Sequence, residues 1–159
     1  MKRFAALVAL LMAGEVFAQN ENRPVDLTIE GSIVCAGDQG ATIPSPGPCA
    51  APARYALRTD EGKLYFFVDQ DPRAEIFKDD RVRAKRLRIS GWARPGNRIE
   101  IIKLQAVRDG VLYDLYYFCE TCNITAYAGG PCPCCREELE FRETRAKKER
   151  MKDERKDEG

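Results

Sequence analysis

The sequence contains no histidine among its 159 residues. A Ser-His-Asp or Cys-His catalytic arrangement is therefore excluded, and so is c-type haem attachment, which requires Cys-x-x-Cys-His. The chain also lacks an excess of charge, because 26 basic and 25 acidic residues give a net charge of +1. It thus has no global basic field of the kind found in dedicated nucleic-acid-binding proteins. We expect neither enzymatic activity nor a nucleic-acid partner, and any metal must be held by thiolates or carboxylates.

Apolar residues form one run near the start, residues 4–13, which is too short to span a membrane as a mature helix. It follows a basic start at residues 1–3 and leads to an Ala-x-Ala-like end at residues 16–18, the order typical of a secretory signal. Residues 1–18 are therefore predicted to be a removed signal peptide, with a buried N-terminal helix as the alternative. The first cysteine is Cys35, too distant for lipidation. We expect an exported protein, periplasmic or secreted, with no membrane span after signal removal.

Alternating hydrophobicity predicts strands in the first half of the mature chain. The first begins at Val25 and runs to Cys35, with Gly31 at an inward position where a missing side chain permits a bend or a close backbone approach. Residues 53–59 and 63–69 are predicted to form a hairpin around a turn at Asp60-Glu61-Gly62.

The second half continues the pattern after a predicted short helix at residues 71–77, which Pro72 favours at its first position. A strand is expected at residues 81–93, with a bulge where the alternation changes phase. A further strand at residues 98–107 shows a second phase change. The Asp109-Gly110 turn then leads into a strand at residues 111–118.

This order of elements resembles the OB-fold, a five-stranded barrel whose helix lies between the third and fourth strands. The resemblance covers residues 25–107 and implies a mostly β fold with a small antiparallel barrel and one short helix. An open antiparallel sandwich is the alternative.

Five of the seven cysteines lie between residues 119 and 135. They include two Cys-x-x-Cys pairs, and each such pair can place two sulfurs on one side of a tetrahedral ion. The segment between the pairs contains Gly129-Gly130-Pro131, which supplies a chain reversal. This crowding predicts a metal site.

The segments 117–122, 130–135 and 141–143 resemble zinc ribbons and the rubredoxin-like knuckles of rubrerythrin-type proteins. The resemblance covers residues 117–143 and implies structural zinc, with rubredoxin-like iron in electron transfer as the alternative. By this resemblance the metal ligands are Cys119, Cys122, Cys132 and Cys135.

Two departures from the rubredoxin-like pattern favour zinc over iron. The glycine common after each second cysteine is replaced by Asn123 and Arg136. Asparagine tolerates a left-handed backbone, whereas arginine is less easily accommodated there. Cys134 is a thiol that the motif does not need, available for metal exchange or a mixed disulfide.

Disulfides are the alternative to metal in an oxidising compartment. The odd number of cysteines and the adjacent Cys134 and Cys135 prevent complete pairing within the cluster, and no strand-helix-strand pattern indicates a thioredoxin-like dithiol. Cys35 and Cys49 bracket the Pro- and Gly-rich residues 37–52. We expect them to form a disulfide that stabilises the fold by about 3 kcal/mol, with two free buried thiols as the alternative.

A basic stretch within the predicted strand at residues 81–93 has two interpretations. It would either bind a polyanion or place charge on an exposed edge to prevent aggregation, and we expect the second. Its members are Arg81, Arg83, Lys85, Arg86 and Arg88.

The sequence therefore predicts four parts. They are a signal peptide (1–18), an OB-like β-barrel domain (19–116), a zinc-ribbon-like metal knuckle (117–143) and a charged, disordered tail (144–159). The expected function is that of an exported, non-enzymatic interaction or binding module with a structural zinc site. The alternatives are an iron electron-transfer protein and a redox or metal-handling protein that uses Cys134. The sequence does not identify the partner, for which a protein is one candidate.

Overall fold

The computed structural model of the chain describes residues 23–37, 42–43 and 47–147. The predicted signal peptide and residues 148–159 of the predicted tail lie outside these described residues. The fold is mostly β, as predicted. Within the described ranges the strands are β1 (Leu27–Ala36), β2 (Thr42–Ile43), β3 (Arg54–Arg58), β4 (Leu64–Phe67), β5 (Arg86–Arg94), β6 (Arg98–Arg108), β7 (Val111–Cys119), β8 (Ile124–Ala126) and β9 (Glu140–Arg145).

Two short helical segments lie between β4 and β5: a 3-10 helix, η1 (Pro72–Lys78), and α1 (Asp80–Arg83). The helix predicted from Pro72 is thus present, and its N-cap Asp71 accepts a hydrogen bond from the backbone N–H of Arg73. Neither segment is long and apolar enough to cross a membrane, and the other described residues contain no helix that is.

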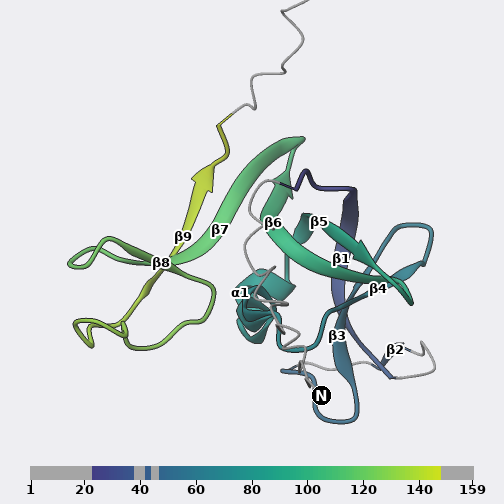
Figure 1. The fold of residues 1–159 in the computed structure, drawn as a ribbon, viewed down its shortest axis with the longest axis horizontal. Helices are drawn as coiled ribbons and strands as arrows, with labels where there is room; N and C mark the ends of the chain where they lie inside the picture. The colour runs from purple at the N-terminus through teal and green to yellow at the C-terminus, as the bar shows by residue number, and fades with distance from the viewer. Residues whose placement is uncertain (1–22, 38–41, 44–46, 148–159) are drawn as a thin grey trace, which may run out of the picture.

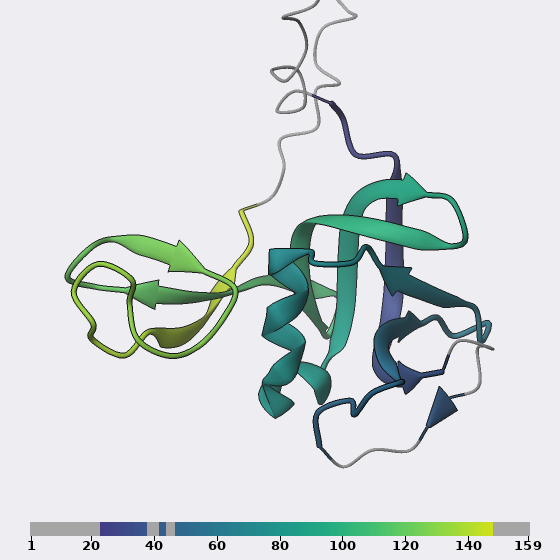
Figure 2. The same ribbon diagram turned by 60° about the horizontal axis from the view of Figure 1, so that its bottom comes forward.

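Five of the strands form a closed circuit of pairings, which we call the ring. β1 pairs with β3 and β5, β4 pairs with β3 and β6, and β5 pairs with β6. The β4–β6 pairing is parallel and the other four are antiparallel. This circuit, with helical segments between its third and fourth strands, agrees with the predicted OB-like arrangement. Figures 1 and 2 show the curved strands with the helical segments beside them.

Gly31 lies near the point where β1 changes its pairing from one neighbouring strand to the other. Residues 27–32 of β1 pair with β5, and residues 32–36 pair with β3. A Cβ atom at Gly31 would lie 2.1 Å from the backbone oxygen of Arg58. The close backbone approach predicted from the sequence is therefore confirmed, and it occurs where the strand changes partner.

The hydrophobic core lies inside the ring and under the helical segments. Phe77 of η1 is fully buried and stacks on Phe67 of β4, with ring centroids 4.7 Å apart. Ile76 and Val82 add buried side chains from the same two segments. Burial of each such side chain stabilises the fold by roughly 1.5–3 kcal/mol, so the helical segments are held mainly by packing.

The strand predicted at residues 81–93 is wrong at its start. Asp79 caps α1 by accepting a hydrogen bond from the backbone N–H of Arg81 at 2.8 Å, and β5 begins only at Arg86. The change of phase between Ala84 and Leu87, predicted as a bulge, marks the transition from helix to strand. A local cap therefore prevails over the weak alternation of this segment.

The second predicted phase change, in β6, is a bulge. Gly91 pairs with Ile101 and Ser90 pairs with Lys103, so Ile102 is the extra residue. At this point β6 passes so close to β5 that a Cβ atom at Gly91 would lie 2.0 Å from the backbone oxygen of Glu100.

The predicted basic edge is also corrected, because its five residues are divided between α1, β5 and the link between them. Arg83 donates hydrogen bonds to the backbone oxygens of Phe77 and Lys78, and Arg88 forms an ion pair with Glu30. The other three side chains form ion pairs with carboxylates as well: Arg81 with Asp79, Lys85 with Glu143, and Arg86 with Asp60 and Glu30.

β7 pairs both with the ring strand β6 and with the strands β8 and β9 of the chain's C-terminal part, residues 117–145, which we call the cysteine-rich segment. Residues 111–114 pair with β6, whereas residues 113–119 pair with β8 or β9. The strand therefore runs across the predicted domain boundary at residue 116, and β9 includes Thr144 and Arg145, which the sequence prediction assigned to the tail. Figure 1 shows the cysteine-rich segment extending away from the ring on this strand.

Candidate metal centre

The four predicted ligands come together. The sulfurs of Cys119, Cys122, Cys132 and Cys135 all lie within 4.8 Å of one another, and those of Cys119 and Cys135 are 3.4 Å apart. A tetrahedral ion with metal–sulfur bonds of about 2.3 Å requires sulfurs about 3.8 Å apart. The donor set and its spacing therefore fit a single metal ion, and we call these four residues the cysteine tetrad.

The first pair of the cysteine tetrad sits on a tight turn between β7 and β8. Cys119 is the last residue of β7 and pairs with Ile124, the first residue of β8. The turn between them contains Cys122 and then Asn123, whose φ of 54° is left-handed. This reversal places the two sulfurs on the same side of the turn.

The second pair repeats this geometry. The backbone N–H of Cys132 donates to the oxygen of Glu137 at 2.7 Å, and that of Arg136 donates to the oxygen of Cys132 at 3.0 Å. Arg136 adopts a φ of 69°, so it occupies the left-handed conformation that Asn123 occupies in the first turn. The expectation that arginine is poorly accommodated here is corrected, and the missing glycines do not discriminate between zinc and iron.

The first cysteine of each pair is buried and the second is only partly buried. Cys119 is 1% exposed and Cys132 is 0% exposed, whereas Cys122 and Cys135 are intermediate. Cys134 is exposed and is not a member of the cysteine tetrad. The structure thus separates four clustered sulfurs from one additional thiol, as predicted from the spacing.

The surroundings of the cysteine tetrad favour a thiolate at one position and oppose it at another. Backbone N–H groups of Cys135 and Cys134 bond to the Cys132 sulfur and lower its pKa to about 7. Hydrogen bonds with neighbouring sulfurs, that of Cys134 first, raise the pKa of Cys122. Four crowded sulfurs cannot all ionise without a cation between them, which is the condition that metal binding satisfies.

Sequence reasoning missed Glu137, whose carboxylate lies beside the cysteine tetrad. Its Oε2 accepts a hydrogen bond from Thr121 Oγ1 at 2.5 Å and lies 3.8 Å from the sulfur of Cys135. The contact joins the first turn to the second. The only sequence signal for this role is that Glu137 follows Cys135 by two residues.

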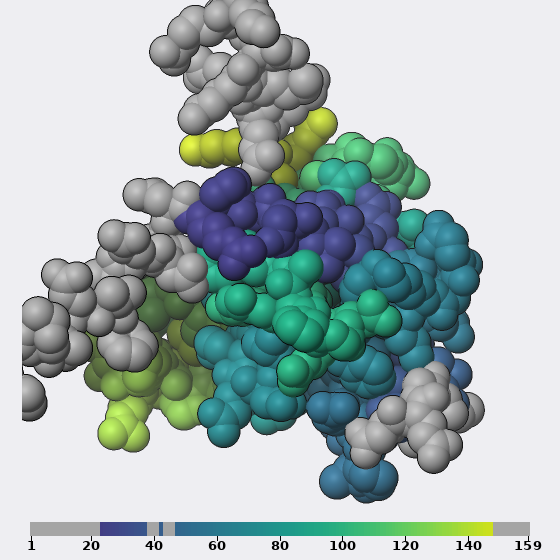
Figure 3. Space-filling model, turned by 45° about the vertical axis from the view of Figure 1, so that its right-hand side comes forward, coloured from purple at the N-terminus to yellow at the C-terminus, as the bar shows by residue number. Residues whose placement is uncertain are grey.

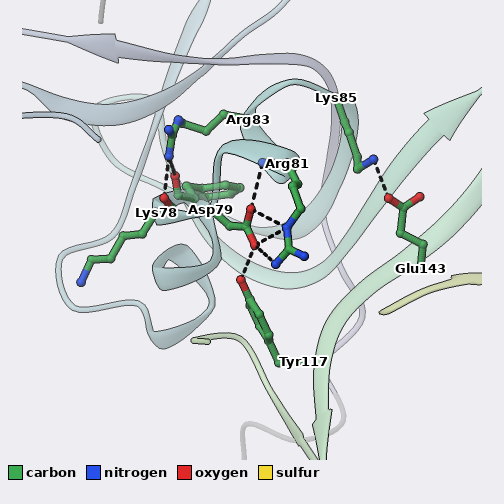
Figure 4. A network of polar contacts seen from close by, with 8 residues as sticks. Lys78, Asp79, Arg81, Arg83, Lys85, Tyr117 and Glu143 are labelled. Carbon is green, nitrogen blue, oxygen red and sulfur yellow. Dashed lines mark hydrogen bonds and ion pairs between the residues drawn. The ribbon is translucent and has the colours of Figure 1, made fainter. Parts of the chain in front are cut away.

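The network around Asp79 was missed as well, and it connects the helical segments to β7 (Figure 4). Tyr117 donates its hydroxyl hydrogen to Asp79 Oδ2 at 2.5 Å, and Arg81 Nη2 binds the same oxygen at 2.6 Å. The Arg81 side chain also lies over the ring of Phe141 in β9. Lys85 and Glu143, 2.5 Å apart, form a second link between this region and β9.

The charges in this network shift two pKa values in opposite directions. The bond from Arg81, followed by that from Tyr117, holds the pKa of Asp79 well below its usual range. Burial, followed by the bond to Asp79, raises the pKa of Tyr117 to about 12. At neutral pH the carboxylate is therefore ionised and the phenol is protonated, so the hydrogen bond between them is fully formed.

The other two cysteines lie at disulfide distance from each other. Cys35 near the end of β1 and Cys49 have Cα atoms 5.5 Å apart and form a disulfide. The chain thus combines one oxidised pair with five free thiols.

Comparison with protein-family models, with curated proteins and with solved structures finds no match to this chain. Its class is therefore defined by the fold and the site. It is a mostly β protein with a cysteine tetrad suited to binding a metal ion.

Proposed function

We propose that this chain is an exported, non-enzymatic interaction module whose cysteine-rich segment is held together by structural zinc. The observation that carries the proposal is the convergence of four sulfurs within 4.8 Å. Four thiolates complete a tetrahedral coordination sphere, which is the pattern of structural zinc sites. Catalytic zinc sites instead leave a position open for water or substrate.

The composition of the segment between β7 and β9 supports a structural role for the ion. Cys119 and Cys132 are the only fully buried side chains that the described structure has between residues 119 and 139. Such a segment has too little apolar surface to order itself, so metal binding would supply the folding free energy. The ion would thereby fix β8 and β9 against β7.

The export part of the proposal has two supports. One is the signal-like order of residues 1–18. The other is the disulfide between Cys35 and Cys49, because disulfides persist in oxidising compartments. N-terminal sequencing of the protein recovered from the medium or periplasm tests this part, and a mature chain that still begins at Met1 contradicts it.

The metal is tested by elemental analysis and thiol counting on the mature protein. We expect one zinc per chain and five thiols titratable after denaturation. The variant Cys132→Ser should lose zinc, whereas the matched variant Cys134→Ser should retain it. A metal-free protein with an oxidised cluster would contradict the proposal, and a coloured, reversibly reducible iron site would identify the electron-transfer alternative.

A redox or metal-handling role is a second candidate because Cys134 is an exposed thiol outside the cysteine tetrad and contributes to the raised pKa of Cys122. Hydrogen peroxide would accept two electrons from the Cys122 thiolate and the Cys134 thiol, forming one disulfide, one water molecule and one hydroxide ion and removing one ligand from the ion. Zinc release on peroxide treatment, followed with a chromophoric chelator, tests this role. Release at equal rates from the native protein and from Cys134→Ser would exclude it.

A further inference from the structure

A groove of about 800 Å³ is lined by residues of the ring strands β1, β5 and β6 and by residues of β7 and β9. Its lining contains no cysteine, and we call this groove the basic groove. Thr28 and Ser90 lie in it with their hydroxyls 2.9 Å apart, on the neighbouring strands β1 and β5. They alternate with the buried Ile29 and Ile89, so the basic groove lies on the outer face of these strands. The turn between β6 and β7 and the end of β9 border it.

The basic groove contains an apolar strip. Ile102, the extra residue of the β6 bulge, contributes to it together with Val111 and Leu112 of β7. Val25 lies at the same groove and is 46% exposed, which makes it the one exposed large hydrophobic side chain in the described part of the chain. Val25 is thus the exposed part of the apolar lining, whereas Ile102, Val111 and Leu112 are half-buried.

All charged side chains that line the basic groove are positive: Arg88, Lys103, Arg145 and Lys147. They come from β5, β6, the last position of β9 and the residues after it. Arg88 forms an ion pair with Glu30, 2.5 Å away, and Lys103 has contacts of its own. Arg145 and Lys147 have no ion pair within the described structure.

The first and last segments of the described chain both contribute residues to the basic groove. Figure 3 shows the N-terminal part of β1, in purple, close to the C-terminal part of the described chain, in yellow. Val25 and Thr28 line the basic groove from the first of these segments, and Arg145 and Lys147 line it from the second. The groove is therefore complete only when β9 is in place beside β7.

The lining restricts the chemistry of the occupant. It contains no phenylalanine, tyrosine or tryptophan, so it offers no platform for stacking bases or sugars. Its two cations without an ion pair in the described structure, Arg145 and Lys147, lie at and just after the end of β9 beside an apolar strip, whereas a lipid carries one compact head group. Carboxylates spaced along a chain, with apolar side chains between them, match this distribution.

We propose that the basic groove binds an acidic peptide segment of a partner protein, with apolar side chains seated on the strip formed by Ile102, Val111 and Leu112. This inference rests on the interaction-module part of the proposed function and names the chemistry of the partner. It does not depend on the identity of the metal, because the lining contains no cysteine.

Fluorescence anisotropy with a fluorescein-labelled peptide of alternating glutamate and leucine tests the proposal on the full mature chain. The double variant Arg145→Glu, Lys147→Glu should weaken binding at least about tenfold, because two attractions become repulsions. The control Lys63→Glu, Lys78→Glu changes the net charge equally, away from the basic groove, and should leave the affinity unchanged. Val25→Asp alters an exposed position without disturbing the core and should also weaken binding.

Three results overturn the proposal: no binding of the glutamate–leucine peptide, equal binding of a glutamate–serine peptide, or unchanged affinity in both groove variants. Preferential binding of oligothymidylate or of anionic phosphatidylglycerol vesicles through the same residues overturns it too. Zinc content and far-UV circular dichroism are measured on every sample. Zinc content of one ion per chain without peptide binding would contradict only the peptide-binding proposal. A metal-free protein would instead contradict the proposed zinc site.

Discussion

The hydroxyl of Tyr117 links β7 to the region between the two helical segments. Tyr117 lies on β7 two positions before Cys119 and donates to Asp79, which lies between η1 and α1. Tyr117→Phe removes this bond while retaining the aromatic ring that packs against Phe141. We expect the free energy of unfolding to fall by about 1.5 kcal/mol in urea denaturation, the cost of losing a hydrogen bond to a charged group.

The neighbouring Tyr116 provides the control for this measurement. Its ring meets Phe118 edge-on and its side chain is only partly buried. Tyr116→Phe should change the free energy of unfolding by less than about 0.5 kcal/mol. Equal effects of the two substitutions would show that the bond from Tyr117 to Asp79 does not stabilise the fold.

A second prediction at the residue scale concerns the effect of a side chain at Gly31 on stability. A methyl group there would meet a backbone oxygen at 2.1 Å, and backbone atoms cannot move aside as the end of a side chain can. Gly31→Ala should destabilise the protein by about 3 kcal/mol in thermal or urea denaturation. Gly47→Ala, where the added methyl group has no neighbour within 4 Å, is the matched control, and an equally large effect there would contradict the explanation.

At the scale of elements, the alternation of apolar and polar residues, together with the turn residues, was sufficient to predict most strands of the ring. The hairpin of β3 and β4 and the bulge in β6 were visible in the sequence because burial of one face imposes a period of two. The start of β5 was not, because the local cap formed by Asp79 determines the structure of residues 80–83. The contact between Asp79 and Tyr117 spans 38 residues, and no local pattern encodes it.

The helical segments provide a prediction of pH dependence. The folded state lowers the pKa of Asp79 below 3.8, so its ionised carboxylate stabilises the fold above about pH 4 and this contribution is lost as the pH falls through the lowered pKa. Asp79→Asn keeps a capping side chain but removes the charge, and should lower the free energy of unfolding by about 1 kcal/mol at pH 7.

The difference between the native protein and Asp79→Asn should then shrink steadily on acidification below about pH 4. Urea denaturation of both proteins in the presence of a chelator measures it without a contribution from the metal. A difference that stays constant over this range would contradict the assignment of the effect to the carboxylate.

The cysteine-rich segment should respond to metal removal separately from the ring. Chelation should abolish hydrogen-exchange protection in residues 119–139, because these residues have little apolar core of their own. Amides of β1, β5 and β6 should retain their protection, since the ring closes through its own pairings. Equal loss of protection in both regions would show that the ring depends on the ion.

At the scale of the whole molecule, the two kinds of sulfur chemistry should be separable. Replacing both Cys35 and Cys49 with serine should lower the free energy of unfolding by about 3 kcal/mol, because the disulfide closes a short loop. Zinc content should remain at one ion per chain, since neither residue belongs to the cysteine tetrad. Loss of zinc in this double variant would show that the disulfide also supports the metal site.

The spacing of the cysteines was enough to predict which four sulfurs meet, but not how they are joined to the rest of the molecule. Cysteine ligands are defined by a short local motif, so they can be read from the sequence. The strand at residues 111–118 was predicted, but its sharing between β6 and β9 was not, because the pairing with β9 joins residues 113–118 to residues 140–145. Long-range strand pairings of this kind depend on the packing of the whole fold.

This shared strand determines how the protein can be divided. A fragment that ends at Cys119 would keep β7 paired with β6 but would remove β8 and β9, so the backbone N–H and C=O groups of residues 113–118 would be exposed along an open edge. Exposed edges of this kind recruit a strand from another molecule. The cysteine-rich segment therefore also protects the ring from self-association, and chains cut within it should form dimers or aggregates.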